Sequence, residues 1–206
     1  MATDGRAELM LKGTTLRLLA LYTCAVLLGL ASAWLWVTRV GMSGVDAGQW
    51  RVNLLAGSTR ADAYTRARIA IFALLALDRR ETLYYTTDRD DDDATLRAEC
   101  TYSVALRPPA ARWWSITAYA ADGFLFPDKA HRYSVSGENA QVDADGRARF
   151  LIAPQSSPAG VDARIATSGT GGMRLTLRLY QPDDSLQRAP QTLDPPRIKK
   201  DGRCVS

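Results

Sequence analysis

The sequence is poor in the residue types that usually hold metals. It has one histidine, His131, and three cysteines among 206 residues. A zinc site needs several histidine or cysteine ligands, so we expect no metal site and no cofactor. The one glycine-dense stretch, "GTGG" (169–172), is not followed by lysine and serine or threonine. We therefore expect a link before a strand there and no phosphate-binding loop.

Long runs of like charge are also missing. The formal net charge is +4, and no basic run is longer than Lys199-Lys200. A nucleic-acid-binding protein usually concentrates its basic residues on one helix or stripe, so we expect no nucleic-acid partner. With 47% hydrophobic and 23% charged residues, the composition is ordinary for one folded domain with a short appendage.

A long uncharged segment lies near the N-terminus. Residues 18–37, "LLALYTCAVLLGLASAWLWV", match the roughly 20 residues that a helix needs to cross a bilayer. Trp34 and Trp36 lie where interfacial aromatic residues are common. We expect a retained transmembrane anchor over 18–38. The alternative is a cleaved signal peptide, because residues 31–33, "ASA", resemble a cleavage site.

The charges around this segment indicate an orientation and a domain plan. Three basic residues precede the segment and two follow it closely, which favours a cytoplasmic N-terminus. These residues are Arg6, Lys12 and Arg17 before it, and Arg39 and Arg51 after it. We expect a cytoplasmic tail (1–17), the anchor, a tether (39–57) and a β-rich domain (58–206) in the bacterial periplasm.

The cysteines agree with export. Cys24 lies inside the apolar segment, and Cys100 and Cys204 are the only cysteines outside it. Two cysteines are enough for one disulfide, which an oxidising compartment allows to form. We expect a Cys100–Cys204 disulfide, with two unpaired cysteines as the alternative.

The segment after the tether has a helical pattern. Ser58 or Thr59 is expected to cap a helix whose first turn carries Asp62. Residues 69–77 are apolar nearly all round and too few to span a membrane, so we expect this part to be buried against protein.

From residue 81 onward the hydrophobic period is two. Alternating apolar and polar residues predict antiparallel strands with one buried face and one wet face. The strand-like segments are "ETLYYTT", "LRAECTYSVAL", "WWSITAYA", "RYSVS", "AQVDADGRARFLIA" and "MRLTLRLY". We expect a mainly β fold: an antiparallel, jelly-roll-like β-sandwich with one packed helix, preceded by the transmembrane helix. The tail "DPPRIKKDGRCVS" is expected to be extended.

Carboxylates are crowded in residues 88–99. Three alternate aspartates and Glu99 have nearly the spacing of an EF-hand calcium loop. Such a loop lies between helices and needs glycine at its sixth position, where this sequence has Asp93. We expect a hairpin loop with solvated aspartates, and weak calcium binding is the alternative.

The strand that starts at Trp113 offers the best candidate for ligand recognition. Trp113, Ser115, Thr117 and Tyr119 share one face, because neighbouring strand residues point to opposite sides. Aromatic and hydroxyl groups in a row can stack on a sugar ring and bond its hydroxyls. The alternative is that the apolar helix (69–77) covers this face.

Three further residues are expected to form the polar rim of such a site. They are Arg112, Arg132 and Tyr133. We expect a non-catalytic domain that binds an envelope polysaccharide or protein partner. A purely structural spacer is one alternative.

Evidence for catalysis in the sequence is weak. A hydrolase using His131 with Ser134 or a nearby acid such as Asp128 is the other alternative. A Gly-x-Ser-x-Gly nucleophile elbow is absent. We therefore assign no catalytic residue.

Several phrases together resemble the bacterial family called domain of unknown function 1214, in its short, membrane-anchored version. They are "ADAYTRARIAIFALLAL", "ETLYYTT", "CTYSV", "RWWSITAYAADGFLFPDKAHRYSVS", "SSPAG" and "MRLTLRLY". The resemblance covers roughly residues 50–204 and implies an envelope location and a β-sandwich domain. The family carries no established catalytic residues.

This chain departs from the family pattern at two places. Members commonly have Asn-Pro before the Arg-Tyr-Ser phrase, whereas this chain has Pro127-Asp128 ahead of "HRYS". A Trp-Leu-Pro phrase that usually follows "SSPAG" is replaced by "VDARIATSGTGG". A ligand shared with relatives is therefore not implied.

Overall fold

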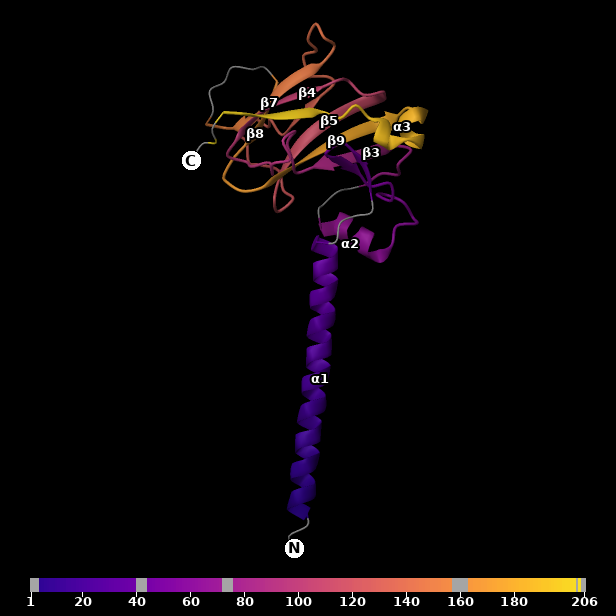
Figure 1. The fold of residues 1–206 in the computed structure, drawn as a ribbon, viewed down its shortest axis with the longest axis vertical. Helices are drawn as coiled ribbons and strands as arrows, with labels where there is room; N and C mark the ends of the chain where they lie inside the picture. Colours follow the sequence, from indigo (N-terminus) through magenta and orange to yellow (C-terminus); the bar gives the residue numbers. More distant parts are fainter. Residues whose placement is uncertain (1–3, 40–43, 72–75, 157–162, 203, 205–206) are drawn as a thin grey trace. The chain divides into compact units, whose positions relative to one another are not determined.

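The computed structural model describes residues 4–39, 44–71, 76–156, 163–202 and 204. The chain divides into two compact units, Met1–Gly41 and Met42–Ser206. The first unit contains helix α1 (Asp4–Arg39) (Figure 1). Within it, Thr14–Val37 is long and apolar enough to cross a membrane, a property that a signal sequence shares. A single apolar N-terminal helix is therefore confirmed.

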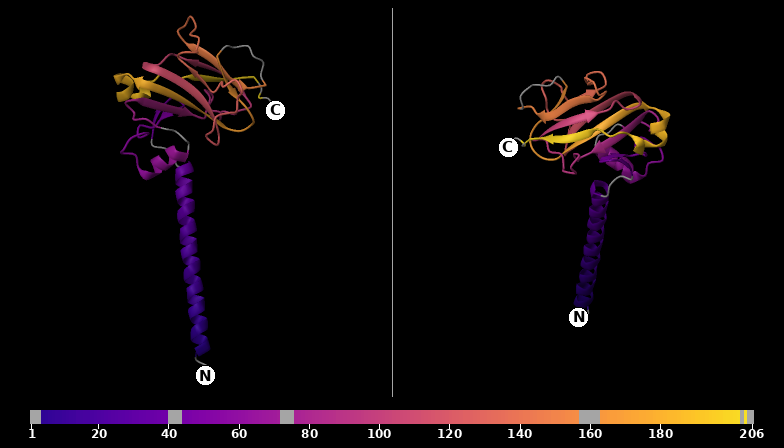
Figure 2. Two further views of the ribbon diagram at one scale, coloured as in Figure 1. Left: turned by 180° about the vertical axis from the view of Figure 1, so that it is seen from behind. Right: turned by 45° about the horizontal axis from the view of Figure 1, so that its top comes forward.

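The second unit is built mainly from two β-sheets, seen from two further sides in Figure 2. The six-stranded sheet has the order β1-β2-β3-β9-β5-β6, and the four-stranded sheet has the order β10-β4-β7-β8. The strands of the first are β1 (Val45–Ala47), β2 (Trp50–Val52), β3 (Thr82–Thr87), β5 (Ala111–Ala120), β6 (Ser134–Ser136) and β9 (Met173–Pro182). Those of the second are β4 (Thr101–Leu106), β7 (Ala148–Pro154), β8 (Arg164–Thr167) and β10 (Arg197–Asp201).

Neighbouring strands pair in an antiparallel manner except β7 and β8, which are parallel. The helices of this unit are α2 (Ala63–Ile71), α3 (Asp184–Arg188) and the 3₁₀ helix η1 (Pro190–Thr192). The described part of the chain thus has ten strands in two sheets, and the predicted mainly β fold is confirmed.

The two sheets share one hydrophobic core, as the alternating pattern predicts. On β9, the leucines and Met173 are at most 2% exposed, and they lie in one cluster with Val104 and Phe150 of the other sheet. Even the irregular stretch before β4 keeps its inward residues buried, as Leu96 and Ala98 show. Burial of alternate residues therefore leaves the opposite side of each sheet for polar groups.

Part of the expected tether belongs to the folded domain. Residues 44–57 contain β1 and β2, and Trp50 and Val52 are buried in the core. The indole Nε1 of Trp50 also donates a hydrogen bond to the carbonyl oxygen of Pro196 at 3.1 Å. The domain therefore begins before residue 58, contrary to the expected boundary, because these short strands complete the edge of the six-stranded sheet.

Helix α2 starts later than expected. The carboxylate of Asp62 accepts hydrogen bonds from the backbone N–H groups of Tyr64 and Thr65, at 2.9 and 3.0 Å. Asp62 is therefore the cap, and Ser58 and Thr59 are not, because its side chain satisfies amides of the first turn. Residues 72–75 of the expected apolar segment, 69–77, lie outside the described residues. Leu77 lies outside any helix and is 37% exposed, so the expected burial is wrong at that residue.

The acidic stretch 88–99 contains the expected local hairpin turn, closed by an antiparallel bridge between Arg89 and Thr95, and it also connects the two sheets. It leads from β3 in one sheet to β4 in the other. Asp90 is 2% exposed, and its Oδ1 accepts hydrogen bonds from two backbone N–H groups of the turn. Asp91 binds Arg197 and the backbone N–H of Ile198. The expectation of solvated aspartates is therefore wrong for these two, and the described residues contain no group of three metal-binding side chains.

The C-terminal tail is an ordered strand. Residues of β10 pair with β4 over Arg197–Asp201, and Cys204 forms the expected disulfide with Cys100, 104 positions earlier. Cys24 is free. The tail therefore supplies the strand next to β4, which would otherwise be the edge of the four-stranded sheet.

Candidate functional site

The outer face of the six-stranded sheet carries polar and aromatic side chains in rows across its central strands. Strand pairing places Trp113 beside Tyr180, and Tyr180 beside Thr82. One row further along, Ser115 lies beside Arg178. The order β3-β9-β5 thus brings three distant segments onto one surface, opposite the leucine face of β9.

A hollow of about 640 Å³ lies at the end of this face and is called here the Trp113 hollow. Its lining residues are Leu77, Glu81, Thr82, Arg112, Trp113, Glu138, Tyr180 and Gln181. Ligand pockets in proteins commonly measure about 300–1,000 Å³. The hollow is therefore large enough for a small organic ligand or for a short segment of a polymer.

The floor of the Trp113 hollow combines aromatic surface with an unsatisfied hydroxyl group. The rings of Trp113 and Tyr180 meet edge to face, with centroids 5.1 Å apart, and both side chains are half-buried. Thr82 is 1% exposed, and its Oγ1 has no hydrogen-bond partner among the described residues. A buried hydroxyl without a partner costs roughly 1–3 kcal/mol. The oxygen is closed to solvent, so this cost falls on the stability of the fold.

The rim of the hollow is held by hydrogen bonds around Gln181. The guanidinium Nη1 of Arg112 donates to Gln181 Oε1 at 3.2 Å, and the Gln181 backbone N–H donates to the carbonyl oxygen of Glu81 at 2.7 Å. Gln181 has φ = 46°, in the left-handed region that residues other than glycine rarely adopt. Such strain is concentrated at functional sites, where the surrounding contacts maintain it.

Thr117 and Tyr119 lie on the same face as Trp113 but outside the hollow. Arg178 donates to Thr117 Oγ1 at 3.1 Å and to the Tyr119 hydroxyl at 2.6 Å, and its guanidinium carbon lies 5.6 Å from the Tyr119 ring centroid. Thr117 is buried. The predicted row therefore exists on one face, and Trp113 is the one residue of the four that lines the hollow.

Arg132 and Tyr133 belong to a separate cluster around Asp128. Arg132 donates to both carboxylate oxygens of Asp128, at 2.9 and 3.0 Å, and these bonds hold the pKa of Asp128 well below its ordinary value. The Tyr133 hydroxyl donates to the Asp128 carbonyl oxygen at 3.1 Å. These two residues therefore hold the loop before β6, and Arg112 is the one predicted rim residue that lines the Trp113 hollow.

The same cluster bears on the hydrolase alternative. His131 Nδ1 lies 3.2 Å from the Tyr133 hydroxyl, and the Asp128 carboxylate is engaged by Arg132. An orienting acid for a catalytic histidine would have to bond the imidazole. Asp128 therefore does not fill that role in this arrangement.

Several hollow residues were missed by sequence reasoning. Thr82 and Tyr180 are the most important, and the alternation of "ETLYYTT" and "MRLTLRLY" does place each of them opposite the core face. Alternation shows on which face of the sheet a residue lies, but it does not show which strand lies next to it. Only the strand order shows that both residues lie beside Trp113.

One solved structure has a similar fold. The crystal structure of the VPA0106 protein from Vibrio parahaemolyticus superposes with a TM-score of 0.55 at 20% identity, covering 69% of this chain and 36% of that one. An uncharacterised protein from Burkholderia cenocepacia gives a TM-score of 0.40 at 17% identity, over 58% of this chain and 29% of that one. This chain thus spans about a third of each solved chain.

No curated protein matches this chain. The profile of the family described as "Protein of unknown function (DUF1214)" matches residues 81–184, from the start of β3 to α3, which is half of the chain. This region contains most of both sheets and nearly all of the Trp113 hollow. The chain therefore belongs to the DUF1214 family.

Proposed function

We propose that the protein is anchored in a bacterial inner membrane by α1, carries its β domain in the periplasm, and binds an envelope glycan there in the Trp113 hollow. The observation that carries the binding proposal is the half-buried Trp113–Tyr180 pair on the floor of the hollow.

The chemistry of the hollow suits a sugar better than a purely apolar ligand. The flat faces of aromatic rings pack against the C–H faces of sugar rings, and sugar hydroxyls can both donate and accept hydrogen bonds. Glu138 and Gln181 offer oxygen acceptors near the rim, and Arg112 offers N–H donors. A few placed polar groups around an aromatic surface are typical of specific ligand sites.

Two features support export of the β domain. The stretch Thr14–Val37 can be inserted as a membrane span. Three basic residues precede its uncharged part, residues 18–37, and two follow it closely. The disulfide closes the C-terminal tail onto the domain, and such bonds persist mainly in oxidising compartments.

The binding test uses the full chain in detergent micelles. We expect Trp113→Ala to weaken binding of soluble peptidoglycan fragments or neutral glucan oligosaccharides at least ~10-fold, the loss of ~1.4 kcal/mol that one aromatic contact can supply. Phe124→Ala is the matched control, because Phe124 is a 68% exposed aromatic outside the hollow. Equal binding of wild type and Trp113→Ala would refute the site, and so would an equal loss in Phe124→Ala.

The location is tested separately by thiol counting in cells. After denaturation, a maleimide polymer should add once per chain, at Cys24, if Cys100 and Cys204 have paired in the periplasm. A chain with its domain in the cytosol should add three. Three additions, together with cytosolic activity of a C-terminal reporter, would contradict the proposed orientation.

A further inference from the structure

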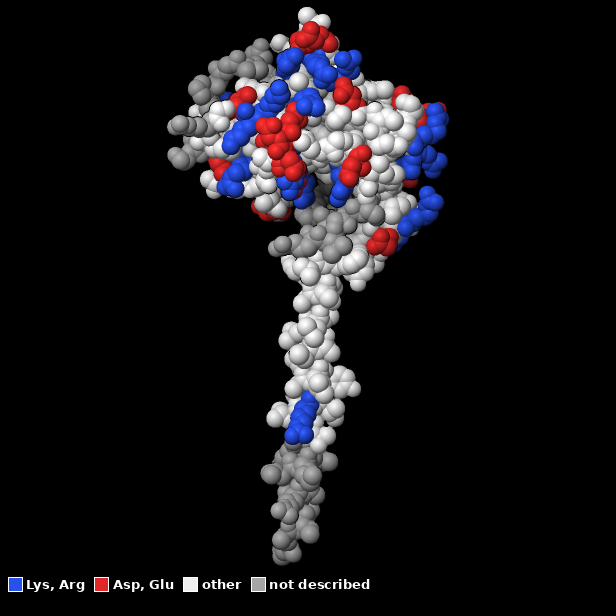
Figure 3. Space-filling view, viewed as in Figure 1, with Lys and Arg blue, Asp and Glu red and all other residues white. Residues whose placement is uncertain are grey.

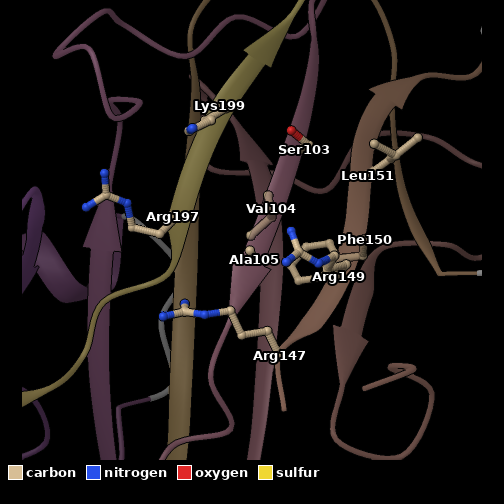
Figure 4. Close-up of a pocket in the computed structure, with 9 residues that line it drawn as sticks. All are labelled: Ser103, Val104, Ala105, Arg147, Arg149, Phe150, Leu151, Arg197 and Lys199. Carbon is tan, nitrogen blue, oxygen red and sulfur yellow. The ribbon is translucent and has the colours of Figure 1, made fainter. Parts of the chain in front are cut away.

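A second hollow, of about 490 Å³, lies on the outer face of the four-stranded sheet and is called here the basic hollow. Its lining residues are Ser103, Val104, Ala105, Arg147, Arg149, Phe150, Leu151, Arg197 and Lys199. Figure 4 shows cationic side chains from the β7 side and from β10 on either side of β4. This surface lies on a different sheet from the Trp113 hollow.

Strand register explains why the middle of this surface is open. Arg197 on β10 pairs with Ala105 on β4, and Ala105 pairs with Arg149 on β7. Neighbouring strands lie about 4.8 Å apart, so the backbones of the two arginines are about 10 Å apart across a single methyl group. In the next row, Ser103 separates Lys199 from Leu151. Small residues on β4 thus leave a space between long cationic side chains.

Carboxylates outside the hollow hold the arginines without using all their donors. Arg197 Nε lies 2.9 Å from Asp91 Oδ2, and Arg147 Nη2 lies 3.6 Å from Asp194 Oδ2. Arg149 pairs with both Asp143 and Asp145, and the bond from Asp143 raises the pKa of Arg149. A guanidinium group has five N–H donors in a rigid fork, so these pairs leave further donors for a ligand. Acidic and basic side chains are correspondingly interleaved over the face of the β domain seen in Figure 3.

Lys199 supplies a cation with no ion pair among the described residues. It is exposed on β10, next to Ser103, whose hydroxyl donates to Asp201 at 3.0 Å. An ammonium group of this kind binds an anion as a mobile point charge, whereas the arginines bind oxyanions in a fixed geometry.

The composition of the basic hollow argues against a nucleic acid. Single-stranded nucleic acids are bound by stacking their bases on accessible aromatic rings. The one aromatic residue of the lining, Phe150, is 2% exposed and belongs to the core. The described lining has no ring available for stacking.

We propose that the basic hollow binds the carboxylate- or phosphate-bearing sugar of an acidic glycan. An anionic group would lie over Ala105 between Arg149 and Arg197, and Lys199 would contact the same unit or its neighbour. The volume suits one or two sugar units. This inference does not depend on the function proposed for the Trp113 hollow.

The test titrates the full chain in detergent micelles with tetragalacturonate as the probe. Lys199→Glu removes a cation, and Ala105→Leu fills the space without any change of charge. Both are expected to weaken binding at least ~10-fold. Lys200→Glu is the matched control, because Lys200 is exposed on the same strand but does not line the hollow, and it should change affinity less than ~2-fold.

Four results would overturn the proposal. They are undetectable binding of tetragalacturonate at millimolar concentration, an equal loss in Lys199→Glu and Lys200→Glu, unchanged binding by a folded Ala105→Leu variant, and equal affinity for a tetraglutamate peptide. If inorganic phosphate competes with tetragalacturonate, the site also accepts phosphate groups. If it does not compete, the site is selective for carboxylates, and both results agree with the proposal. Trp113→Ala should leave tetragalacturonate binding unchanged, so failure of one site is distinguishable from failure of the other.

Discussion

Replacement of Cys204 by serine should destabilise the β domain without unfolding its last strand. Cys204 is half-buried, whereas Cys100 is 1% exposed, so Cys204→Ser removes the bond and keeps the packing of Cys100. Strand β10 retains its pairing with β4 and its contacts with Asp91, and Pro196 just before it keeps the hydrogen bond from Trp50. The effect should therefore come mainly from the unfolded chain, which gains conformational freedom.

The expected magnitude follows from the length of the closed loop. The bond joins residues 104 positions apart, for which the chain-entropy model gives about 4.7 kcal/mol at 25 °C. Real unfolded chains are more compact than that model assumes, so we expect a loss of about 3 kcal/mol in the free energy of unfolding. With a urea dependence of about 2 kcal/mol/M, the unfolding midpoint should fall by about 1.5 M.

The measurement is urea unfolding of the oxidised full chain in detergent, followed by tryptophan fluorescence. Cys24→Ser is the control and should leave the midpoint unchanged, because Cys24 is free. Reduction of the wild type should reproduce the Cys204→Ser midpoint. A fall of less than ~0.3 M on loss of the bond would refute the reasoning.

Three further predictions concern single side chains. Thr82→Val should raise the free energy of unfolding by about 1 kcal/mol in ligand-free protein, because it removes a buried hydroxyl that has no partner among the described residues. Thr82→Ser keeps the hydroxyl and should not raise it, and a loss of stability in the valine variant would contradict the assignment. Asp128→Asn should destabilise the domain at pH 7, because the hydrogen bonds from Arg132 hold the folded-state pKa of Asp128 below its ordinary 3.8. The carboxylate therefore contributes to the free energy of unfolding above about pH 4, and this contribution is lost as the pH falls further. Urea unfolding of both proteins at pH 7 and pH 3 checks this, and a gap that does not narrow at pH 3 would contradict it. Leu177→Ala should cost about 2–5 kcal/mol in urea unfolding, because Leu177 is 0% exposed in the shared core, and a cost below ~1 kcal/mol would show that the site collapses freely.

Local patterns predicted the fold class correctly. The alternation over "MRLTLRLY" and the uncharged N-terminal stretch are properties of consecutive residues, so one sequence is enough to see them. The pairing of Cys100 with Cys204 followed from their number and from the expected compartment. These features do not depend on which strand lies beside which.

Short or non-repeating elements escaped prediction. Strands β1 and β2 have three residues each, too few to show a period, so they were assigned to a tether. The acidic stretch forms the expected hairpin turn, but its flanking strands lie in different sheets. Asp90 accepts hydrogen bonds from amides of its own turn, and only Asp91 is brought against β10 by the crossing between the sheets.

By itself, the sequence determined which residues face the core, where a membrane helix can form, and which cysteines are available to pair. Tertiary structure alone decided the two hollows. Thr82 and Tyr180 meet Trp113 because β9 lies between β3 and β5, and Arg149 faces Lys199 and Arg197 because β4 lies between β7 and β10. Strand order and register arise from packing of the whole core, and alternation within one strand carries no information about its neighbours.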